Sequence, residues 1–331
     1  MQPEGAGPVF IVGCERSGTT LLRLMLNAHP ALAIPGETWY LPELEEERER
    51  IRGEGAADWR ERILAVITAK NTFPELGVPR EEIAAALAGV DVADGGAVLS
   101  CAHRAFAARE GKPRWGDKTP GYVRRLPLLA RRFPGASVIH VVRDGRDVAL
   151  SLLDKPFGPK TVVDAAVHWK ARVEEGEREG PRLFGARYRE VRYEDLVAGP
   201  EERLRSLCTW LGLGFDAAML RYHERAGSYL REEHHWHGKT RTPVAGDRSG
   251  RWKGEMAAGD QVWFQRIAGR TLARHGYEPT PHRSAAVSLR WAVRGMRLGA
   301  AGSWLRAKIG ARRLLRAAGV PLPEGARRAR R

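Results

Sequence analysis

Two short runs of almost wholly apolar residues stand out in the pattern of hydrophobic and polar positions. They lie at Val9–Gly13 and Ala136–Val142. Runs of this length, closed by glycine or by charged residues, are typical of strands that are buried on both faces of a parallel sheet. A third strand is predicted at Ala186–Val191.

Segments with helical spacing separate and follow these strands. Helices are predicted at Leu21–Asn27, Leu41–Ile51, Glu61–Lys70, Arg80–Ala88, Tyr122–Phe133, Arg143–Leu153 and Gly199–Leu211, and a turn at Gly116–Pro120. Strands that alternate with helices predict an α/β fold, in which helices flank both faces of a mainly parallel sheet. The segment between the predicted helix at Leu41 and Trp115 shows no recognisable chemistry, and we expect it to cover the sheet or the substrate cleft.

The net charge of the chain is +15, with 55 Lys and Arg against 40 Asp and Glu in 331 residues. A charge of this size indicates a polyanionic partner, such as nucleic acid, an anionic membrane or a phosphate-rich ligand. Residues 282–331 hold 13 Lys and Arg against 1 acidic residue, and so carry most of the excess. We therefore predict a nearly neutral globular domain over residues 1–281 and a basic helical extension over residues 282–331. Because the globular part is nearly neutral, we expect no nucleic-acid partner.

The basic extension has features of an amphipathic helix between residues 284 and 318. Five basic residues would share one face of a continuous helix: Arg290, Arg294, Arg297, Lys308 and Arg312. Such a helix can lie on an anionic membrane, which predicts peripheral contact with the inner face of the membrane. Several glycines weaken a long helix, so a helix packed on the globular part and a solvated tail are alternatives.

The cysteines and the apolar segments bear on the compartment. Cys14, Cys101 and Cys208 are widely spaced and odd in number, so they provide no disulfide framework and no Cys-x-x-Cys metal pair. We expect them to be small buried residues. The chain begins without a basic leader, and no segment is apolar over enough residues to cross a bilayer, which predicts a cytoplasmic protein. Three histidines within 234–237 lack a carboxylate or cysteine to complete a metal site, so a loop of the substrate cleft is the better interpretation.

The glycine-bearing loop after the first strand is a candidate anion site. Gly13–Thr20 has the G-x-x-x-x-G-K-[ST] spacing of a nucleotide-binding P-loop, except that Thr19 stands in the lysine position. Such a loop points backbone N–H groups at a phosphate, and the following helix N-terminus adds partial positive charge. Phosphate binding survives without the lysine, whereas ATP or GTP hydrolysis is disfavoured. On this motif alone, a structural turn is an equal alternative.

A second candidate anion site follows the strand at 136–142. Arg143 stands at the end of that strand, and Ser151 follows about two helical turns later. An arginine and a hydroxyl can together hold a separate phosphate. The structural alternative is an ion pair between Arg143 and Asp147 at the start of the helix.

Together these segments resemble the sulfotransferases that use 3′-phosphoadenosine 5′-phosphosulfate (PAPS). Arg16–Arg23 is similar to the family's 5′-phosphosulfate loop, and Arg143–Ser151 is similar to its 3′-phosphate motif. Further matches occur at Gly36–Thr38, Asp117–Pro120 and Val191–Leu196, with a weaker one at Gly250–Glu255. The branch that the chain resembles most is the bacterial enzymes similar to tyrosylprotein sulfotransferases. The resemblance implies a P-loop-like central sheet and covers roughly residues 9 to 212.

The resemblance also implies roles for individual residues. Sulfuryl transfer is an in-line displacement at sulfur, so the enzyme must position donor and acceptor and stabilise charge on the leaving phosphate oxygen. Glu37 would take the proton of the acceptor hydroxyl, while Lys118 and Arg16 would stabilise the leaving group. The residues implied in binding PAPS, or its product PAP, are Arg16, Ser17, Gly18, Thr19, Thr20, Arg143, Ser151 and Tyr193, with Arg251 or Lys253 closing over the nucleotide. No metal is needed, because these cations and the backbone amides supply the charge.

Two residues beside this predicted site have alternative interpretations. Glu15 is an acidic residue where the family more often has proline, and we expect its side chain to point away from the anion. Trp39, next to Glu37, is predicted to pack in the core, with stacking on an acceptor ring as the alternative.

Two further hypotheses come from other functional classes. A P-loop kinase or NTPase requires a lysine before Thr20, and that lysine is missing. A non-catalytic, membrane-associated nucleotide-binding protein would not need Glu37 or Lys118. If the chain is a sulfotransferase, we expect its acceptor to be a carbohydrate, a glycolipid or a small natural product, with a tyrosyl peptide as the alternative. The sequence does not predict an oligomeric state.

Overall fold

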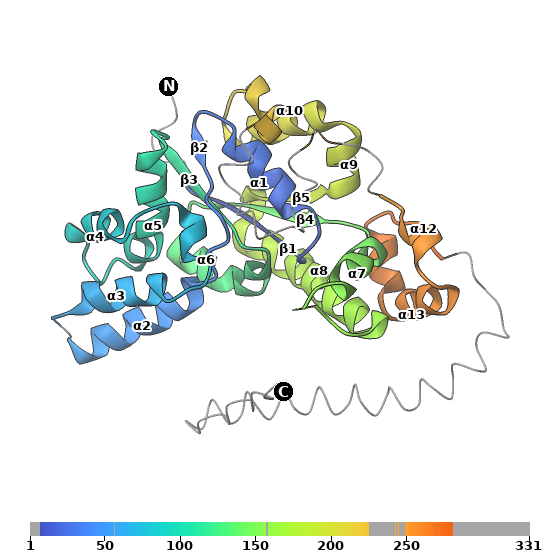
Figure 1. Cartoon of the computed structure of the whole chain (residues 1–331), viewed down its shortest axis with the longest axis horizontal. Helices are drawn as coiled ribbons and strands as arrows, with labels where there is room; N and C mark the ends of the chain where they lie inside the picture. The colour runs from blue at the N-terminus through green and yellow to red at the C-terminus, as the bar shows by residue number, and fades with distance from the viewer. Residues whose placement is uncertain are drawn as a thin grey trace, which may run out of the picture. The chain divides into compact units, whose positions relative to one another are not determined.

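The computed structural model describes residues 7–55, 57–156, 158–224, 242, 244 and 249–280. Five strands form one sheet, namely β1 (Val9–Gly13), β2 (Leu32–Ala33), β3 (Arg114–Lys118), β4 (Ser137–Val142) and β5 (Tyr188–Arg192). The strand order is β2-β3-β1-β4-β5, and all four neighbouring pairs are parallel (Figure 1). The predicted α/β fold with a parallel central sheet is therefore confirmed.

The helices follow the strands in the predicted alternation, with a helical insertion between β2 and β3. They are α1 (Thr19–Asn27), α2 (Leu41–Glu54), α3 (Trp59–Thr68), α4 (Arg80–Ala88), α5 (Gly95–Arg109), α6 (Leu126–Arg132), α7 (Gly145–Leu153), α8 (Val162–Phe184), α9 (Tyr193–Ala198), α10 (Pro200–Leu211), α12 (Trp252–Glu255) and α13 (Ala258–Arg274). Short 3₁₀ helices lie at Phe73–Leu76, Pro120–Arg125, Gly185–Arg187, Ala217–Met219 and Tyr222–Glu224.

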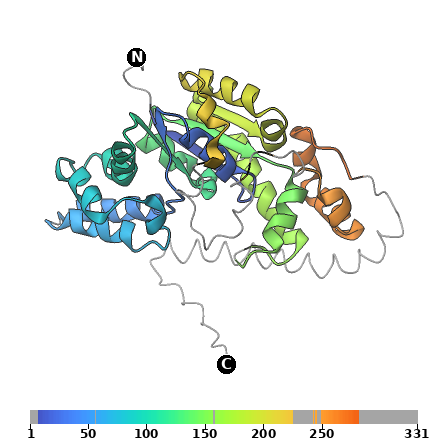
Figure 2. The same ribbon diagram turned by 45° about the horizontal axis from the view of Figure 1, so that its top comes forward.

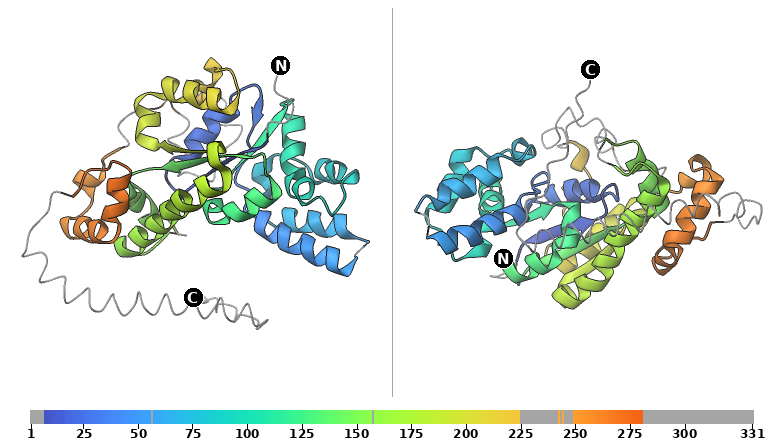
Figure 3. Two further views of the ribbon diagram at one scale, coloured as in Figure 1. Left: turned by 180° about the vertical axis from the view of Figure 1, so that it is seen from behind. Right: turned by 90° about the horizontal axis from the view of Figure 1, so that it is seen from below.

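Both faces of the sheet are covered because successive side chains of a strand point to opposite sides. Val9 and Ile11 pack with α1, α9 and α10 in one buried cluster. Phe10 and Val12, one residue out of phase, pack in a different cluster with the helices between β2 and β4. Figures 1 and 2 show α1, α9 and α10 on one face, and the view from behind in Figure 3 shows α8 crossing the other.

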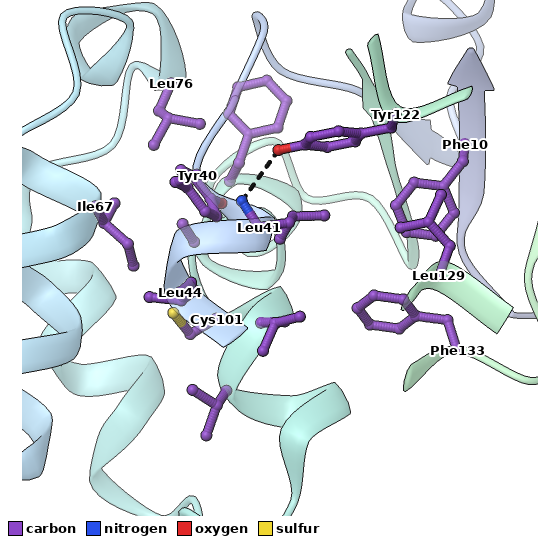
Figure 4. Close-up of a cluster of buried hydrophobic side chains, with 14 of the residues drawn as sticks. Phe10, Tyr40, Leu41, Leu44, Ile67, Leu76, Cys101, Tyr122, Leu129 and Phe133 are labelled. Carbon is purple, nitrogen blue, oxygen red and sulfur yellow. Dashed lines mark hydrogen bonds between the residues drawn. The ribbon is translucent and has the colours of Figure 1, made fainter. Parts of the chain in front are cut away.

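The helices between β2 and β3 build a second layer of core next to the sheet. Figure 4 shows Tyr40 and Leu41 at the start of α2 packed with Ile67 of α3 and Cys101 of α5, while Phe10 of β1 joins the same cluster. The hydroxyl of Tyr122 accepts a hydrogen bond from the Leu41 backbone amide at 3.1 Å. Through α5, which packs against β2 and β3, this segment covers part of the sheet, one of the two roles expected for it. All three cysteines are free and buried, which confirms that prediction.

Some predicted elements differ from the structure. The turn at Gly116–Pro120 is wrong, because Gly116, Asp117 and Lys118 form the end of β3. Because these residues are polar, the hydrophobic pattern did not indicate a strand here. The strand is buried nonetheless, because other buried groups form hydrogen bonds with its side chains. The helix predicted at Tyr122–Phe133 divides into a 3₁₀ turn and α6, with Pro127 in the first turn of α6. β2, α5, α8 and α13 were not predicted.

Part of the chain lies outside these observations. Of the described residues, those from 7 to 256 and from 263 to 279 form one compact unit, which contains all the predicted site residues, and residues 257–262 fall outside that unit. The histidines at 234–237 and the basic segment 284–318 lie outside the described residues, so the domain boundary at 281/282 and the membrane contact stay predictions. Within the described ranges, no helix combines the length and apolarity that spanning a membrane requires.

Candidate active site

Each of the five strands has a predicted site residue at or after its carboxyl end, and these ends lie at one edge of the sheet. The phosphate loop follows β1, Glu37 follows β2, Lys118 ends β3, Arg143 follows β4, and Tyr193 follows β5. Because every strand is parallel, these five ends meet at the same edge. β1 is the central strand of the sheet, so its loop lies between the residues contributed from either side.

The loop after β1 has the tight backbone geometry of an anion cradle. Arg16 and Gly18 both have positive φ angles, 69° and 93°, just before α1 begins at Thr19. A Cβ on Gly18 would lie 2.3 Å from the ring of Tyr193, so only glycine allows this ring to approach. The N-terminus of α1 carries no side-chain cap, which leaves its first N–H groups free of a capping side chain and directed out of the helix.

Ser17 provides an independent sign that this loop binds a polar ligand. Its side chain is fully buried, and its Oγ has no hydrogen-bond partner among the residues that the structure describes. A buried hydroxyl without a partner costs stability in a folded protein, so such a group commonly awaits a ligand or an ordered water. The loop therefore fits an anion that accepts this hydrogen bond.

Glu37 and Lys118 form a direct ion pair beside the loop. Lys118 Nζ lies 2.6 Å from Glu37 Oε1 and also donates to Thr20 Oγ1 at 3.2 Å. The Lys118 side chain is buried, and burial lowers its pKa from the ordinary 10.5, against the opposing effect of the Glu37 charge. The structure therefore brings the predicted base, the predicted cation and the first turn of α1 into contact.

The two predicted phosphate motifs are also joined. Arg16 Nε donates to Ser151 Oγ at 3.0 Å, and Arg143 Nη1 donates to the Arg16 carbonyl at 3.2 Å. The guanidinium of Arg143 lies 4.6 Å from the centre of the Tyr193 ring. Burial and the nearby Arg143 charge lower the pKa of Arg16, as expected for cations gathered where an anion would compensate them.

A sequence model of the Sulfotransferase family matches residues 8–217, a span that contains the loop, Glu37, Lys118, Arg143 and Tyr193. The chain belongs to the sulfotransferase family. Protein-tyrosine sulfotransferase 2 of Gallus gallus is 27% identical over 286 residues, which cover 82% of this chain and 69% of that protein. Protein-tyrosine sulfotransferase 1 of Danio rerio is 29% identical over 286 residues, covering 82% of this chain and 72% of the relative.

Two solved structures show the same fold. The sulfotransferase domain of the Synechococcus PCC 7002 olefin synthase has a TM-score of 0.53 at 24% identity, covering 82% of this chain and 97% of that domain. The sulfotransferase domain from the curacin biosynthetic pathway has a TM-score of 0.57 at 21% identity, covering 83% of this chain and 99% of that domain.

In this sulfotransferase, the ion pair of the structural alternative, between Arg143 and Asp147, is present at 3.9 Å, but Asp147 has closer partners. Its carboxylate accepts hydrogen bonds from the Gly250 and Trp252 backbone amides, at 2.7 and 2.9 Å. The helix is capped instead by Asp144, whose side chain accepts from the Arg146 amide. Asp147 thus ties the Gly250–Glu255 segment to the start of α7.

The two basic residues predicted to close over the nucleotide are engaged elsewhere. Arg251 pairs with Glu255, with its Nε 2.8 Å from Oε1, and Lys253 Nζ lies 2.9 Å from Glu278 Oε2. Both side chains are exposed. Their segment is fixed beside α7 through Asp147, but no contact of theirs with the loop residues is seen in the described part of the chain, and their predicted role stays a prediction.

Glu15 is held by α8. Its Oε2 lies 2.8 Å from His168 Nε2 and 2.9 Å from Arg172 Nε. Burial alone would raise the pKa of Glu15, but the hydrogen bond from His168 and the charge of Arg172 outweigh it and lower the pKa. Cys14, Glu15 and His168 lie close enough to hold a metal ion, yet Arg172 already neutralises the carboxylate and burial raises the pKa of the Cys14 thiol. These three side chains are therefore better suited to the ion pair with Arg172 than to binding a metal ion.

A buried network next to the Glu37–Lys118 ion pair was not predicted. Asp117 Oδ2 accepts hydrogen bonds from Thr38 Oγ1 at 2.6 Å and faces His103 Nε2 at 2.8 Å. Thr38 adjoins Glu37 and Asp117 adjoins Lys118, so one carboxylate ties together the backbones that carry both residues. His103 comes from α5, in the segment without recognisable chemistry. A single histidine in a helix matches no motif, so the sequence offered no signal for it.

Proposed function

We propose that this sulfotransferase moves the sulfuryl group of PAPS to an acceptor hydroxyl. The contact that carries the proposal is the Glu37–Lys118 ion pair, which stands beside the first turn of α1 at Thr20. A base and a buried cation next to an anion cradle match what in-line transfer of a charged group requires. Membership of the sulfotransferase family argues against the P-loop kinase or NTPase alternative.

The residues of the cradle fit a doubly phosphorylated donor. The buried Ser17 hydroxyl and the backbone N–H groups at the start of α1 suit the 5′-phosphosulfate end. Arg143 and Ser151, reached through Arg16, suit the 3′-phosphate, and the Tyr193 ring packs against Gly18 close to both. When bound, PAPS supplies the sulfuryl group and a phosphate leaving group. The chain supplies the charges that bind both ends, and this assignment requires no metal.

The proposed reaction divides its work between Glu37 and Lys118. Glu37 takes the proton of the acceptor hydroxyl as the acceptor oxygen forms its bond to sulfur. The bond between sulfur and the 5′-phosphate oxygen breaks, and Lys118, with Arg16, stabilises the negative charge left on that oxygen. The products are a sulfate ester and PAP, and the proton is on Glu37.

For the acceptor, we propose a hydroxyl compound without negative charge near the reacting oxygen, such as a carbohydrate, a glycolipid or a small natural product. The side chain of Glu75 packs against Gly36, where a Cβ would lie 3.0 Å from Glu75 Oε2, so a second carboxyl group adjoins Glu37. An anionic acceptor would add a like charge there. A tyrosyl peptide is the second candidate, favoured by the names of the relatives in Gallus gallus and Danio rerio.

The test is transfer from ³⁵S-labelled PAPS to a panel of neutral sugars, phenols and tyrosyl peptides. We expect a labelled ester with at least one acceptor, and loss of transfer in Glu37→Ala and Lys118→Ala with PAP still bound. If PAP binds no better than AMP, the donor assignment is wrong. If both variants transfer at the wild-type rate, the catalytic assignment is wrong.

A cytoplasmic location and membrane contact through residues 284–318 stay predictions, to be checked by fractionation.

A further inference from the structure

Trp39 has an unusual backbone and an unusual exposure for its size. Its φ angle is 56°, and the only other described residue apart from glycine with a positive φ is Arg16 in the phosphate loop. A bulky aromatic residue in the left-handed region is strained and persists only where its surroundings fix it. The side chain is also 37% exposed, so the prediction that Trp39 packs in the core is wrong.

The contacts of Trp39 explain why the strained conformation is kept. The indole Nε1 donates to Glu37 Oε2 at 2.7 Å. The ring lies over Gly121, where a Cβ would come within 2.6 Å of it, and its centre is 6.3 Å from that of Tyr122. Glu37 is therefore held from two sides, by Lys118 on Oε1 and by the indole on Oε2.

This position places the partly exposed indole directly beside the proposed base. Because the indole Nε1 is 2.7 Å from Glu37 Oε2, an acceptor whose hydroxyl reaches this carboxylate oxygen comes close to the ring. Aromatic side chains bind the flat faces of other rings by dispersion and by their quadrupole, and they gain less from a flexible open chain. The exposed part of the ring is thus available to the part of the acceptor that carries the hydroxyl.

We propose that Trp39 is a positioning residue for Glu37 and selects acceptors whose hydroxyl is attached to or next to a ring. The inference rests on the proposed role of Glu37 as the base. The indole N–H orients the carboxylate, and the ring face binds the acceptor ring. The two functions are separable, because phenylalanine keeps a ring and lacks the N–H, whereas alanine lacks both.

The experiment compares the wild type with Trp39→Phe, Trp39→Ala and a matched control, Trp210→Phe. Trp210, in α10, also uses its indole N–H, which donates to the Ala186 carbonyl at 2.9 Å. Ala186 precedes β5, at the end of the sheet opposite the carboxyl ends of the strands. Two neutral acceptor pairs are used, cyclohexanol with hexanol and benzyl alcohol with heptanol. The measurements are kcat, KM for each alcohol and the affinity for PAP.

We expect the wild type to prefer the ring member of each pair by about tenfold in kcat/KM, within the range for a change of this size in an apolar contact. Trp39→Phe keeps the preference but loses about tenfold in kcat with little change in KM, the effect of one hydrogen bond that orients a charged group. Trp39→Ala also loses the preference. PAP affinity is unchanged in both, and Trp210→Phe behaves as the wild type.

Specific results would overturn the inference. A wild type without ring preference, or Trp39→Ala with the full preference, shows that the indole does not select the acceptor. Trp39→Phe with unchanged kcat shows that the N–H does not position Glu37. Transfer to none of these alcohols, or full activity in Glu37→Ala, counts against the proposed function instead, and PAP binding then tells whether the donor half of that proposal survives.

Discussion

Lys118 Nζ lies 2.6 Å from Glu37 Oε1, with 3% of the lysine side chain exposed against 25% of the glutamate side chain. The cation is thus sealed between the sheet and α1, while the carboxylate reaches the surface. The proposed leaving group and acceptor differ in the same way, because the donor would bind at the partly buried phosphate loop and the acceptor would enter from solvent. Lys118 is therefore on the side of the proposed leaving group, and Glu37 is on the side from which the proposed acceptor would enter.

The burial of Lys118 predicts the alkaline side of the pH–rate profile. Its pKa is lowered, first of all by burial, so the ammonium loses its proton below the ordinary 10.5 of a lysine. The neutral amine cannot stabilise the leaving oxygen, and kcat should therefore fall as the pH rises towards that value. Lys118→Arg should remove this alkaline decline at some loss of rate, because a guanidinium stays charged throughout.

Lys118→Ala should lower kcat by about 10²–10³, the effect typical of removing one group that stabilises charge in a transition state. Lys70→Ala is the control, since Lys70 forms an ion pair with Glu43 away from the proposed site residues. If kcat of Lys118→Arg declined at alkaline pH with the same shape as kcat of the wild type, a group other than Lys118 would be responsible for that decline.

Gly18 offers a test of the phosphate loop that separates backbone strain from contact. Gly18→Ala places a Cβ at a φ of 93° and 2.3 Å from the Tyr193 ring, so the loop or the ring must move. We expect PAP affinity to fall at least tenfold. Gly77→Ala is a matched control, because Gly77 also has a positive φ, 63°, but nothing lies within 4 Å of its Cβ position. It should cost about 1 kcal/mol of stability and leave PAP affinity unchanged. Equal effects of both substitutions on PAP affinity would contradict the prediction.

The sequence could predict the features that depend on residues close together in the chain. β1 and β4 are short, mainly apolar runs, and the loop after β1 has a recognisable spacing, so both strands and the phosphate loop could be predicted from the sequence. The Arg251–Glu255 pair could also have been predicted from its i, i+4 spacing. β2 has only 2 residues and no periodicity to detect.

The unpredicted features arise from contacts between distant segments. Lys253 and Glu278 are 25 residues apart, and the conformation and exposure of Trp39 depend on Gly121. His103 is 14 residues from Asp117 and on another element, so only the packing of α5 against β3 reveals the network. In each case the sequence contained the chemical group but not the neighbour that gives it a role.

The buried network that joins His103, Asp117 and Thr38 predicts a positioning role for His103. His103→Ala leaves the buried Asp117 carboxylate with one partner fewer, which should cost about 1–3 kcal/mol of stability. It should also lower kcat more than it changes the KM for PAPS, because Asp117 holds both Thr38, next to Glu37, and the backbone of Lys118. His103→Gln keeps an N–H donor on a side chain of similar length and should recover part of both losses.

The measurements are steady-state kinetics and urea unfolding of the two variants. A variant of Tyr40, whose hydroxyl lies 3.2 Å from His103 Nδ1 on the side away from Asp117, is the control. Tyr40→Phe should lose stability with little change in kcat. If kcat is unchanged in His103→Ala while stability falls, the network is structural only.

A second buried cluster, between α8, α13, β4 and β5, predicts how stability depends on pH. His275 lies between Glu177 and Glu190, 3.3 and 3.6 Å away, and Glu190 also faces His140 at 3.5 Å. Burial lowers the pKa of His275 below the ordinary 6.5, opposed by the two carboxylates and reinforced by the charges of His140 and Arg274. For Glu190, burial raises the pKa, but the hydrogen bond from His140 and the charges of both histidines outweigh it, so its pKa lies below 4.5.

Both shifts make the protein less stable in acid. The unfolded chain binds a proton at residue 275 more readily than the folded chain, so stability falls as the pH drops below 6.5 and through the lowered pKa of His275. Glu190 adds a second decline below pH 4.5, because there too the unfolded state takes up the proton first. Urea midpoints measured from pH 7.5 to pH 5 should decrease in the wild type. They should decrease less in His275→Gln, which cannot titrate in that range. A midpoint that rises towards pH 5, or a slope unchanged in His275→Gln, would show that other groups control the acid stability of this fold.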